Sequence, residues 1–137
     1  MEAYSMDFSE KIRTARIARQ WSQKDLAEKT GISLRTIQNY ELGSRLPKKQ
    51  ETYTLLAEVL GIEESSLLDE NVSFVLRANE RYGSNAMKQA LDLVADVRAL
   101  WAGGEMAEED MDEIMRAMQE AYWEAKENNR RRKAEKQ

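Results

Sequence analysis

Helical spacing of apolar residues runs along almost the whole chain, and a single proline, Pro47, interrupts it. Near the C-terminus Met111, Ile114, Met115 and Met118 recur at intervals of three and four residues, the pattern of an amphipathic helix. A β-sheet protein would need a turn about every 8–12 residues, and usually more glycine and proline than the six and one present here. The sequence therefore predicts an all-α fold.

The predicted helices begin at polar capping residues and end at glycines. Ser9 is a plausible first cap, Ser22 and Asp25 have the spacing of a capping box, and Ser84 or Asn85 would cap a later helix. Gly31, Gly43, Gly61 and the Gly103–Gly104 pair would stop helices. We expect helices over 9–20, 22–30, 34–42, 50–60, 72–82, 84–102 and 107–128, with a short closing turn at 67–68.

Composition excludes most catalytic and metal-binding chemistry. The 137 residues contain no Cys and no His, which removes the thiolate, the commonest general base and the usual zinc ligands. We expect no enzyme activity, no cofactor and no metal. Neither a run of about 18 apolar residues nor an apolar signal core near the N-terminus is present, so we expect a cytoplasmic protein without a membrane span.

The net charge of −4 hides a division between the two halves. Residues 1–62 hold ten basic against eight acidic residues, a charge of +2, whereas residues 63–137 hold eleven against seventeen, a charge of −6. The change near Gly61 indicates a domain boundary. A basic first half is suited to phosphate, and an acidic second half would limit non-specific adhesion.

The most specific pattern lies between Gln23 and Tyr40, where two short helices flank an abrupt turn. Ala27 is small enough for a close helix crossing, and Gly31 suits a turn at positive φ. This is the helix-turn-helix pattern, in which the second helix enters the DNA major groove. The apolar residues that would hold both helices against the remainder of the domain are Leu26, Ile32, Ile37 and Tyr40.

Residues 9–62 resemble the phage repressor/Cro type of helix-turn-helix, also called the xenobiotic-response-element (XRE) family. The residues that carry the resemblance are 13–27 (RTARIARQWSQKDLA), 31–33 (GIS), 36–43 (TIQNYELG) and Pro47. The resemblance implies a five-helix DNA-binding domain. The second half, through 102–105 (AGGE) and 121–126 (AYWEAK), resembles the helical extension of some repressor-like proteins of Gram-positive bacteria and their mobile elements.

The outward face of the helix at 34–42 supplies the candidate base-reading residues. Since Ile37 and Tyr40 face inward, Leu34, Arg35, Gln38 and Asn39 face outward. Arg35 can pair with a guanine edge, Gln38 or Asn39 with adenine, and Leu34 can touch a thymine methyl group. An ordinary solvated polar face is the alternative interpretation of these residues.

Further site residues follow from the resemblance and from the surrounding polar side chains. Gln23 matches the family's phosphate clamp, and Arg16 and Glu41 match a family ion pair that ties the first helix to the end of the recognition helix. The remaining phosphate-binding candidates are Thr36, Ser44, Arg45, Lys48 and Lys49.

Two long helices at 84–102 and 107–128 are expected to form a hairpin that dimerises the chain. Pairing two recognition helices about 34 Å apart matches a palindromic site, and two hairpins could form a four-helix bundle. The alternative is that the hairpin packs only on its own DNA-binding domain. The candidate dimerisation residues are Leu91, Val94, Leu100, Trp101, Met111, Ile114, Met115, Met118 and Tyr122.

The predicted organisation is an N-terminal arm at 1–8, a helix-turn-helix domain at 9–62, a connecting helical segment at 63–83, the hairpin at 84–128 and a fraying basic tail at 129–137. The predicted function is a sequence-specific, DNA-binding transcription regulator, a repressor that binds its operator as a homodimer. The alternative is an antitoxin-like protein that neutralises a partner protein and regulates its own operon. Acidic residues at 105–113 are expected to favour a helix dipole rather than to bind a cation. The basic run at 130–133 is expected to be a solvated helix end rather than a second DNA contact.

Overall fold

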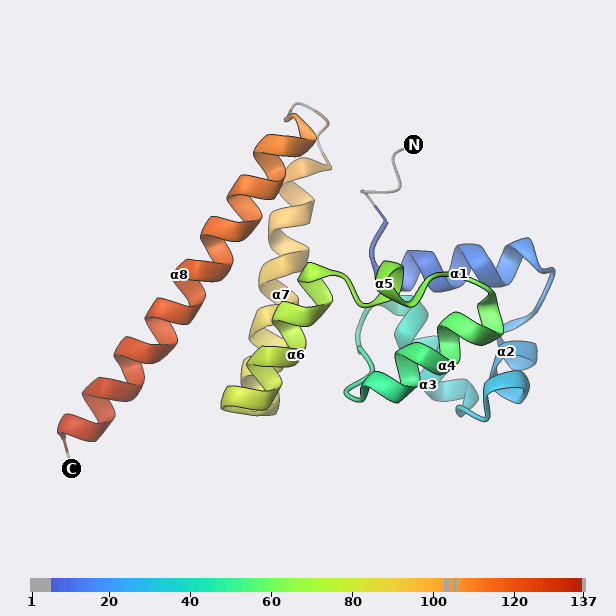
Figure 1. Cartoon of the computed structure of the whole chain (residues 1–137), viewed down its shortest axis with the longest axis horizontal. Coiled ribbons are helices and arrows are strands. Elements are labelled where there is room, and N and C mark those ends of the chain that lie inside the picture. The colour runs from blue at the N-terminus through green and yellow to red at the C-terminus, as the bar shows by residue number, and fades with distance from the viewer. Residues whose placement is uncertain (1–5, 103, 105, 137) are drawn as a thin grey trace. The chain divides into compact units, whose positions relative to one another are not determined.

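The structure, a computed structural model, describes residues 6–102, 104 and 106–136, and this part of the chain is helical without strands (Figure 1). The all-α prediction is confirmed. Two compact units meet within one helix, the first ending at Arg77 and the second beginning at Ala78. The helices are α1 (Phe8–Ala18), α2 (Gln23–Thr30), α3 (Leu34–Leu42), α4 (Gln50–Leu60), α5 (Glu64–Leu67), α6 (Glu70–Tyr82), α7 (Ser84–Trp101) and α8 (Glu108–Glu135).

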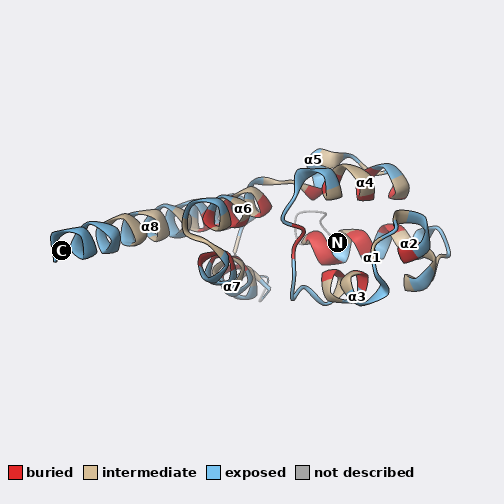
Figure 2. Cartoon of the chain, turned by 90° about the horizontal axis from the view of Figure 1, so that it is seen from below, coloured by how far each residue is buried: buried red, intermediate tan, exposed pale blue. Residues whose placement is uncertain are grey.

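The first unit packs α1 to α5 around a core of aliphatic and aromatic side chains, and their buried faces are turned toward one another (Figure 2). The ring of Phe8 meets the rings of Tyr40 and Tyr53 edge-on, at centroid distances of 5.8 and 5.5 Å. Tyr53 is fully buried, and its hydroxyl donates a hydrogen bond of 2.7 Å to the carbonyl of Pro47. The other fully buried core residues include Ile12, Leu26, Ile37, Leu56 and Leu60.

The first helix starts one residue earlier than the sequence suggested, because Asp7 rather than Ser9 is its cap. The Asp7 carboxylate accepts a hydrogen bond from the backbone N–H of Glu10, whose side chain accepts in return from the N–H of Asp7. Ser9 is a buried residue inside α1, and its hydroxyl donates to the Asp7 carboxylate at 2.6 Å. A capping box with an acid on both sides therefore takes precedence over the serine, and Phe8 joins the core instead of the N-terminal arm.

The two helices of the predicted motif have the expected ends. Ser22 and Asp25 form a capping box at the start of α2, and Ser33 caps α3 by accepting from the N–H of Thr36. Gly31 ends α2 at φ 77°, a left-handed conformation that L-residues with a side chain adopt only at a cost. The chain is thereby turned from α2 directly into α3.

A glycine rather than Ser84 or Asn85 starts α7. Gly83 donates its N–H to the carbonyl of Asn79 at 2.9 Å and so closes α6, and it is also the residue before the first turn of α7. Its φ of 94° and ψ of −173° lie in a region open essentially to glycine alone. One residue makes the whole reversal, which leaves Ser84 inside the helix. Asp69 caps α6 through the N–H of Val72, so α6 begins at Glu70 instead of residue 72.

In the second unit α7 and α8 form the predicted antiparallel hairpin. Tyr122 of α8 donates a hydrogen bond of 3.2 Å to the carbonyl of Ala86 in α7, and Trp101 at the other end of α7 donates to the carbonyl of Met106 at 3.1 Å. Tyr82, at the end of α6, lies with its ring centroid 6.3 Å from that of Trp123. The buried residues between the helices include Ala90, Val94, Val97, Met111 and Met115.

The basic tail continues α8 instead of fraying. The helix runs to Glu135, and residues 128–136 are exposed along it. Residues 124–135 hold no glycine or proline, and Arg, Lys, Glu and Ala are strong helix formers, so intrinsic propensity extends the helix beyond its packed part. Residues 1–5, Gly103 and Glu105, for which an arm, a helix stop and part of the acidic cluster were predicted, lie outside the described residues.

We predict that Tyr53→Phe destabilises the first unit by about 1–2 kcal/mol at pH 7, because the Pro47 carbonyl loses its buried donor. Burial raises the pKa of Tyr53, so its contribution is complete below about pH 10, the pKa of an unfolded tyrosine, and declines above it. Urea unfolding of both chains should show the wild-type advantage shrinking by about 1.4 kcal/mol by pH 11. An advantage that is constant with pH would contradict the assignment.

Candidate nucleic-acid interface

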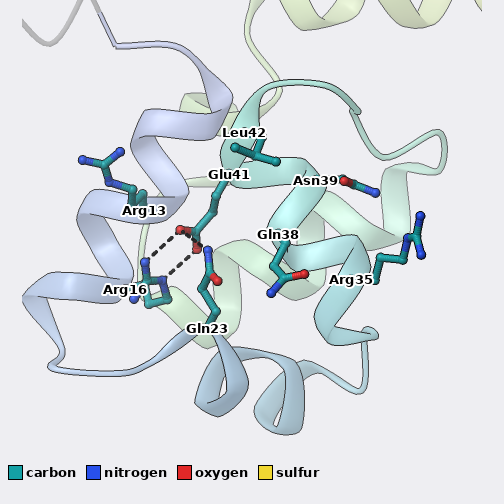
Figure 3. A pocket seen from close by; sticks show the side chains of 8 residues that line it. All are labelled: Arg13, Arg16, Gln23, Arg35, Gln38, Asn39, Glu41 and Leu42. Carbon is teal, nitrogen blue, oxygen red and sulfur yellow. Dashed lines mark hydrogen bonds and ion pairs between the residues drawn. The ribbon is translucent and has the colours of Figure 1, made fainter.

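An open depression on the first unit gathers polar and cationic side chains from three helices (Figure 3). Its floor and rim come from α1, from the first residue of α2 and from the outward side of α3. The lining residues are Arg13, Arg16, Gln23, Arg35, Gln38, Asn39, Glu41 and Leu42.

Arg16 and Glu41, the pair implied by the family resemblance, form a two-pronged ion pair in this depression. The Arg16 Nε lies 2.7 Å from Glu41 Oε2, and Arg16 Nη2 lies 2.8 Å from Glu41 Oε1. Only 12% of the Arg16 side chain and 3% of the Glu41 side chain are exposed. The hydrogen bonds to Glu41 raise the pKa of Arg16 above its ordinary value, so the guanidinium is charged at any physiological pH.

The same pair connects four segments of the domain. Arg16 lies on α1 and its Nη1 donates to the carbonyl of Trp21, in the turn before α2, at 2.8 Å. Glu41 lies near the end of α3 and also accepts from the Gln23 amide at 3.2 Å. The carboxylate is therefore shared between a guanidinium and an amide, which fixes α1, α2 and α3 relative to one another.

Gln23 contributes both a side-chain amide and the N-terminus of α2 to this part of the domain. It is the first residue of α2, where backbone N–H groups point out of the helix end and favour an anion. Its amide is oriented by Glu41 and lines the depression.

The four predicted base readers lie on the outward side of α3. Ile37 and Tyr40 are buried, and this directs Arg35 and Gln38 into solvent, with Asn39 partly exposed beside them. Figure 3 shows Arg35, Gln38 and Asn39 projecting from α3. Leu34, at the start of the helix, is 40% exposed but is outside the set that lines the depression.

The predicted phosphate-binding residues occupy two kinds of environment, and all of them apart from Gln23 lie outside the set that lines the depression. Thr36 accepts from the Ser33 hydroxyl at 2.9 Å, and Ser44 donates to the carbonyl of Asn39 at 3.2 Å, so both hydroxyls contribute to the ends of α3. The three cations of the loop between α3 and α4, namely Arg45, Lys48 and Lys49, are exposed.

Two lining residues were not among the predicted site residues. Arg13 lies one turn before Arg16 on α1, and Leu42 lies one turn after Gln38 on α3, with 78% of its surface exposed. Arg13 is three residues from Arg16 and Leu42 is four residues from Gln38, so each shares a helix face with a predicted site residue. This spacing is visible in the sequence. The sequence does not reveal the angle at which α1 approaches the end of α3.

Residues 12–67 match the helix-turn-helix family model. The matched segment begins inside α1 and ends with the last residue of α5, so it covers the part of the chain that carries the depression. Over this segment the chain is therefore similar to the helix-turn-helix family, in agreement with the XRE-type resemblance. The helices from α6 onward lie outside the match. No curated protein and no solved structure is significantly similar to the chain.

The described ranges hold neither a membrane-spanning helix nor a cluster of metal-binding side chains. Among these residues no helix is both long and apolar enough to cross a membrane, and no group of acidic side chains is arranged to hold a metal ion. The acidic residues Glu108, Glu109 and Asp110 occupy the first turn of α8, where carboxylates are favoured by the helix dipole.

We predict that Glu41→Ala destabilises the domain by about 3 kcal/mol, because it leaves the largely buried Arg16 guanidinium without its counter-charge. Chemical denaturation checks this. Glu51→Ala, which removes an exposed carboxylate from α4, is the matched control and should stay within about 0.5 kcal/mol of wild type. Equal effects of the two substitutions would show that the buried pair does not hold the helices together.

Proposed function

We propose that this protein is a sequence-specific transcription regulator of bacterial type, a cytoplasmic repressor that binds a palindromic operator as a homodimer. The observation that carries the proposal is the display of Arg35, Gln38 and Asn39 on one side of α3 while its other side is buried. A helix presented in this way fits the major groove, and its partners are base edges rather than a substrate.

The chemistry of each side chain suggests what it reads. Arg35 carries a fork of donors that matches O6 and N7 of guanine, and the amides of Gln38 and Asn39 match N6 and N7 of adenine. Leu34, exposed at the first turn of α3, suits a thymine methyl group. Leu42, at the last turn, offers a second apolar contact beside the depression.

Around this reading surface the proposal assigns contacts with the DNA backbone. Arg45, Lys48 and Lys49 follow α3 in an exposed loop, where mobile cations can meet phosphates without fixed geometry. Gln23 at the start of α2 and Arg13 on α1 offer contacts on the other side of the depression. The hydroxyls of Thr36 and Ser44 act at the ends of α3, where they contribute to its position.

The dimer is assigned to the hairpin of α7 and α8, with one refinement to the predicted contact residues. Val94, Met111 and Met115 are buried inside a single chain, so they belong to the core of the hairpin itself. Leu100 and Met118 are 67% and 42% exposed and remain accessible to a partner. Leu91, Trp101, Ile114 and Tyr122 are partly exposed.

Selection of binding sites from random DNA, followed by titration against the selected site, tests the function. We predict that Arg35→Ala costs about 1–3 kcal/mol in binding free energy and removes the preference at one base pair of each half-site. Enrichment of a palindrome supports the homodimer. An unchanged base preference in the Arg35→Ala protein would contradict the assigned readout, and failure to enrich any sequence would contradict the function.

We predict a different effect for Lys48→Ala, because an exposed lysine contacts phosphate and carries no sequence information. Binding should weaken equally for selected and random duplexes, and the dependence of log K on log salt should become shallower by about one per protomer. Fluorescence anisotropy at several salt concentrations measures both effects. Lys88→Ala, exposed on α7, is the control and should leave the slope unchanged. A loss confined to the selected site would make Lys48 a base reader.

A further inference from the structure

One side of the α7–α8 hairpin carries apolar residues that its own chain leaves open. On α8, Trp123 faces Tyr82 and Arg81 of α6. The Arg81 guanidinium lies 5.0 Å from the centroid of the Trp123 ring. The helical phase places Ile114 and Met118 on the side of α8 opposite to Trp123. Met118 is 42% exposed and Ile114 is partly exposed, so this side has no complete cover.

The open side of α8 carries a stripe of positions that repeats every 11 residues. The positions 110, 114, 117, 121, 125, 128 and 132 follow one another at intervals of 4, 3, 4, 4, 3 and 4 residues, an 11-residue repeat that keeps them on one stripe of the helix. The interior of the stripe is apolar, since it holds Ile114 and the exposed alanines Ala117, Ala121 and Ala125, with Met118 at its edge. We call this stripe the α8 seam.

The two ends of the α8 seam carry opposite charges, and so do the two ends of the whole helix. Asp110 begins the seam and Arg132 ends it, and both are exposed. Around Asp110 the segment 108–113 holds five acidic residues and no basic one, whereas the segment 130–136 holds five basic residues and one acidic residue. Asp110 and Arg132 are 22 positions apart, about 33 Å along the helix, and cannot pair within one chain.

We propose that the α8 seam is the dimer interface, and that it is occupied by the α8 seam of a second copy of this chain running antiparallel to the first. The two-fold axis passes beside Ala121, and Asp110 lies opposite the partner's Arg132 at each end. This inference rests on the homodimer of the proposed function and specifies its surface and direction. The small side chains at 117, 121 and 125 let the two helix axes approach to about 8 Å.

Charge complementarity selects this occupant and this direction. In the antiparallel arrangement the acidic segment of each α8 meets the basic segment of the other, twice over because of the two-fold axis. A parallel pair would place acid against acid and base against base. The seam is also centred on Ala121, close to the midpoint of α8 between Glu108 and Glu135, so the two helices overlap along their full length.

Cysteine cross-linking tests the direction, and the chain suits it because it contains no cysteine of its own. Ala121→Cys lies beside the two-fold axis and should form a disulfide-linked dimer under mild oxidation. Ala125→Cys is displaced from its own copy by about 12 Å in the antiparallel arrangement and should not. Glu120→Cys, exposed on another side of α8, is the control. Equal cross-linking at 121 and 125 would indicate a parallel pair, and none at 121 would overturn the proposal.

Charge exchange tests the contacts at the ends of the seam. Asp110→Arg and Arg132→Asp should each weaken the dimer about tenfold by sedimentation equilibrium at low salt, and the double exchange should restore the wild-type dissociation constant. Glu113→Arg makes the same change of charge off the seam and should have a much smaller effect. Failure of the double exchange to rescue either single variant would overturn the pairing.

Two outcomes distinguish a failure of the α8 seam from a failure of the homodimer. A chain that remains dimeric with Met118→Asp and shows no cross-linking at 121 would keep the homodimer and lose the α8 seam as its interface. A wild-type chain that is monomeric at micromolar concentration would contradict the homodimer and this inference together. DNA binding by the helix-turn-helix domain is measured independently in both cases.

Discussion

The position of α3, the proposed recognition helix, depends on one largely buried ion pair. Arg16 and Glu41 join α1 to the end of α3, and through Trp21 and Gln23 they also hold the turn before α2 and the start of α2. Replacing a buried pair by apolar residues is often neutral for stability, whereas removing one partner is costly, so the pair matters most for arrangement. The directional bonds leave one relative position of three helices, whereas apolar contacts alone would tolerate small rotations. The proposed base-reading surface on α3 is set by that position.

The sequence predicted most accurately what local chemistry decides. The ends of α2 and α3 follow from Ser22, Gly31 and Ser33, because side-chain caps and positive φ are decided within four residues. Errors occurred where two local candidates competed. Asp7 took precedence over Ser9 because its acid partner Glu10 completes a capping box, and Gly83 took precedence over Ser84 because only glycine could make the reversal in one residue. The continuation of α8 to Glu135 shows that intrinsic helix propensity decides the structure where no tertiary packing opposes it.

The site was predictable wherever one helix determines it. The phase of α3 directs Arg35 and Gln38 outward because Ile37 is buried, and the sequence contains that information. Arg13 and Leu42 become part of the depression only through the approach of α1 to α3, which no single periodicity encodes. The same limit applies to the hairpin. The methionines of α8 share one broad apolar face in the sequence, and only the packing of α7 separates the buried Met111 and Met115 from the exposed Met118.

The net charge of −4 has a consequence for how the proposed DNA recognition would work. Glu41 is neutralised by Arg16, so the cations that remain in the lining of the depression are Arg13 and Arg35, with three more in the loop after α3. Non-specific affinity for DNA grows with the number of phosphates neutralised, and an acidic remainder of the chain opposes it. A protein of this charge gains little from phosphates alone and depends on direct contacts with bases and on the simultaneous use of two half-sites. The segregated charges of α8 are then more useful for joining two copies than for attracting nucleic acid, because pairing within the dimer neutralises them.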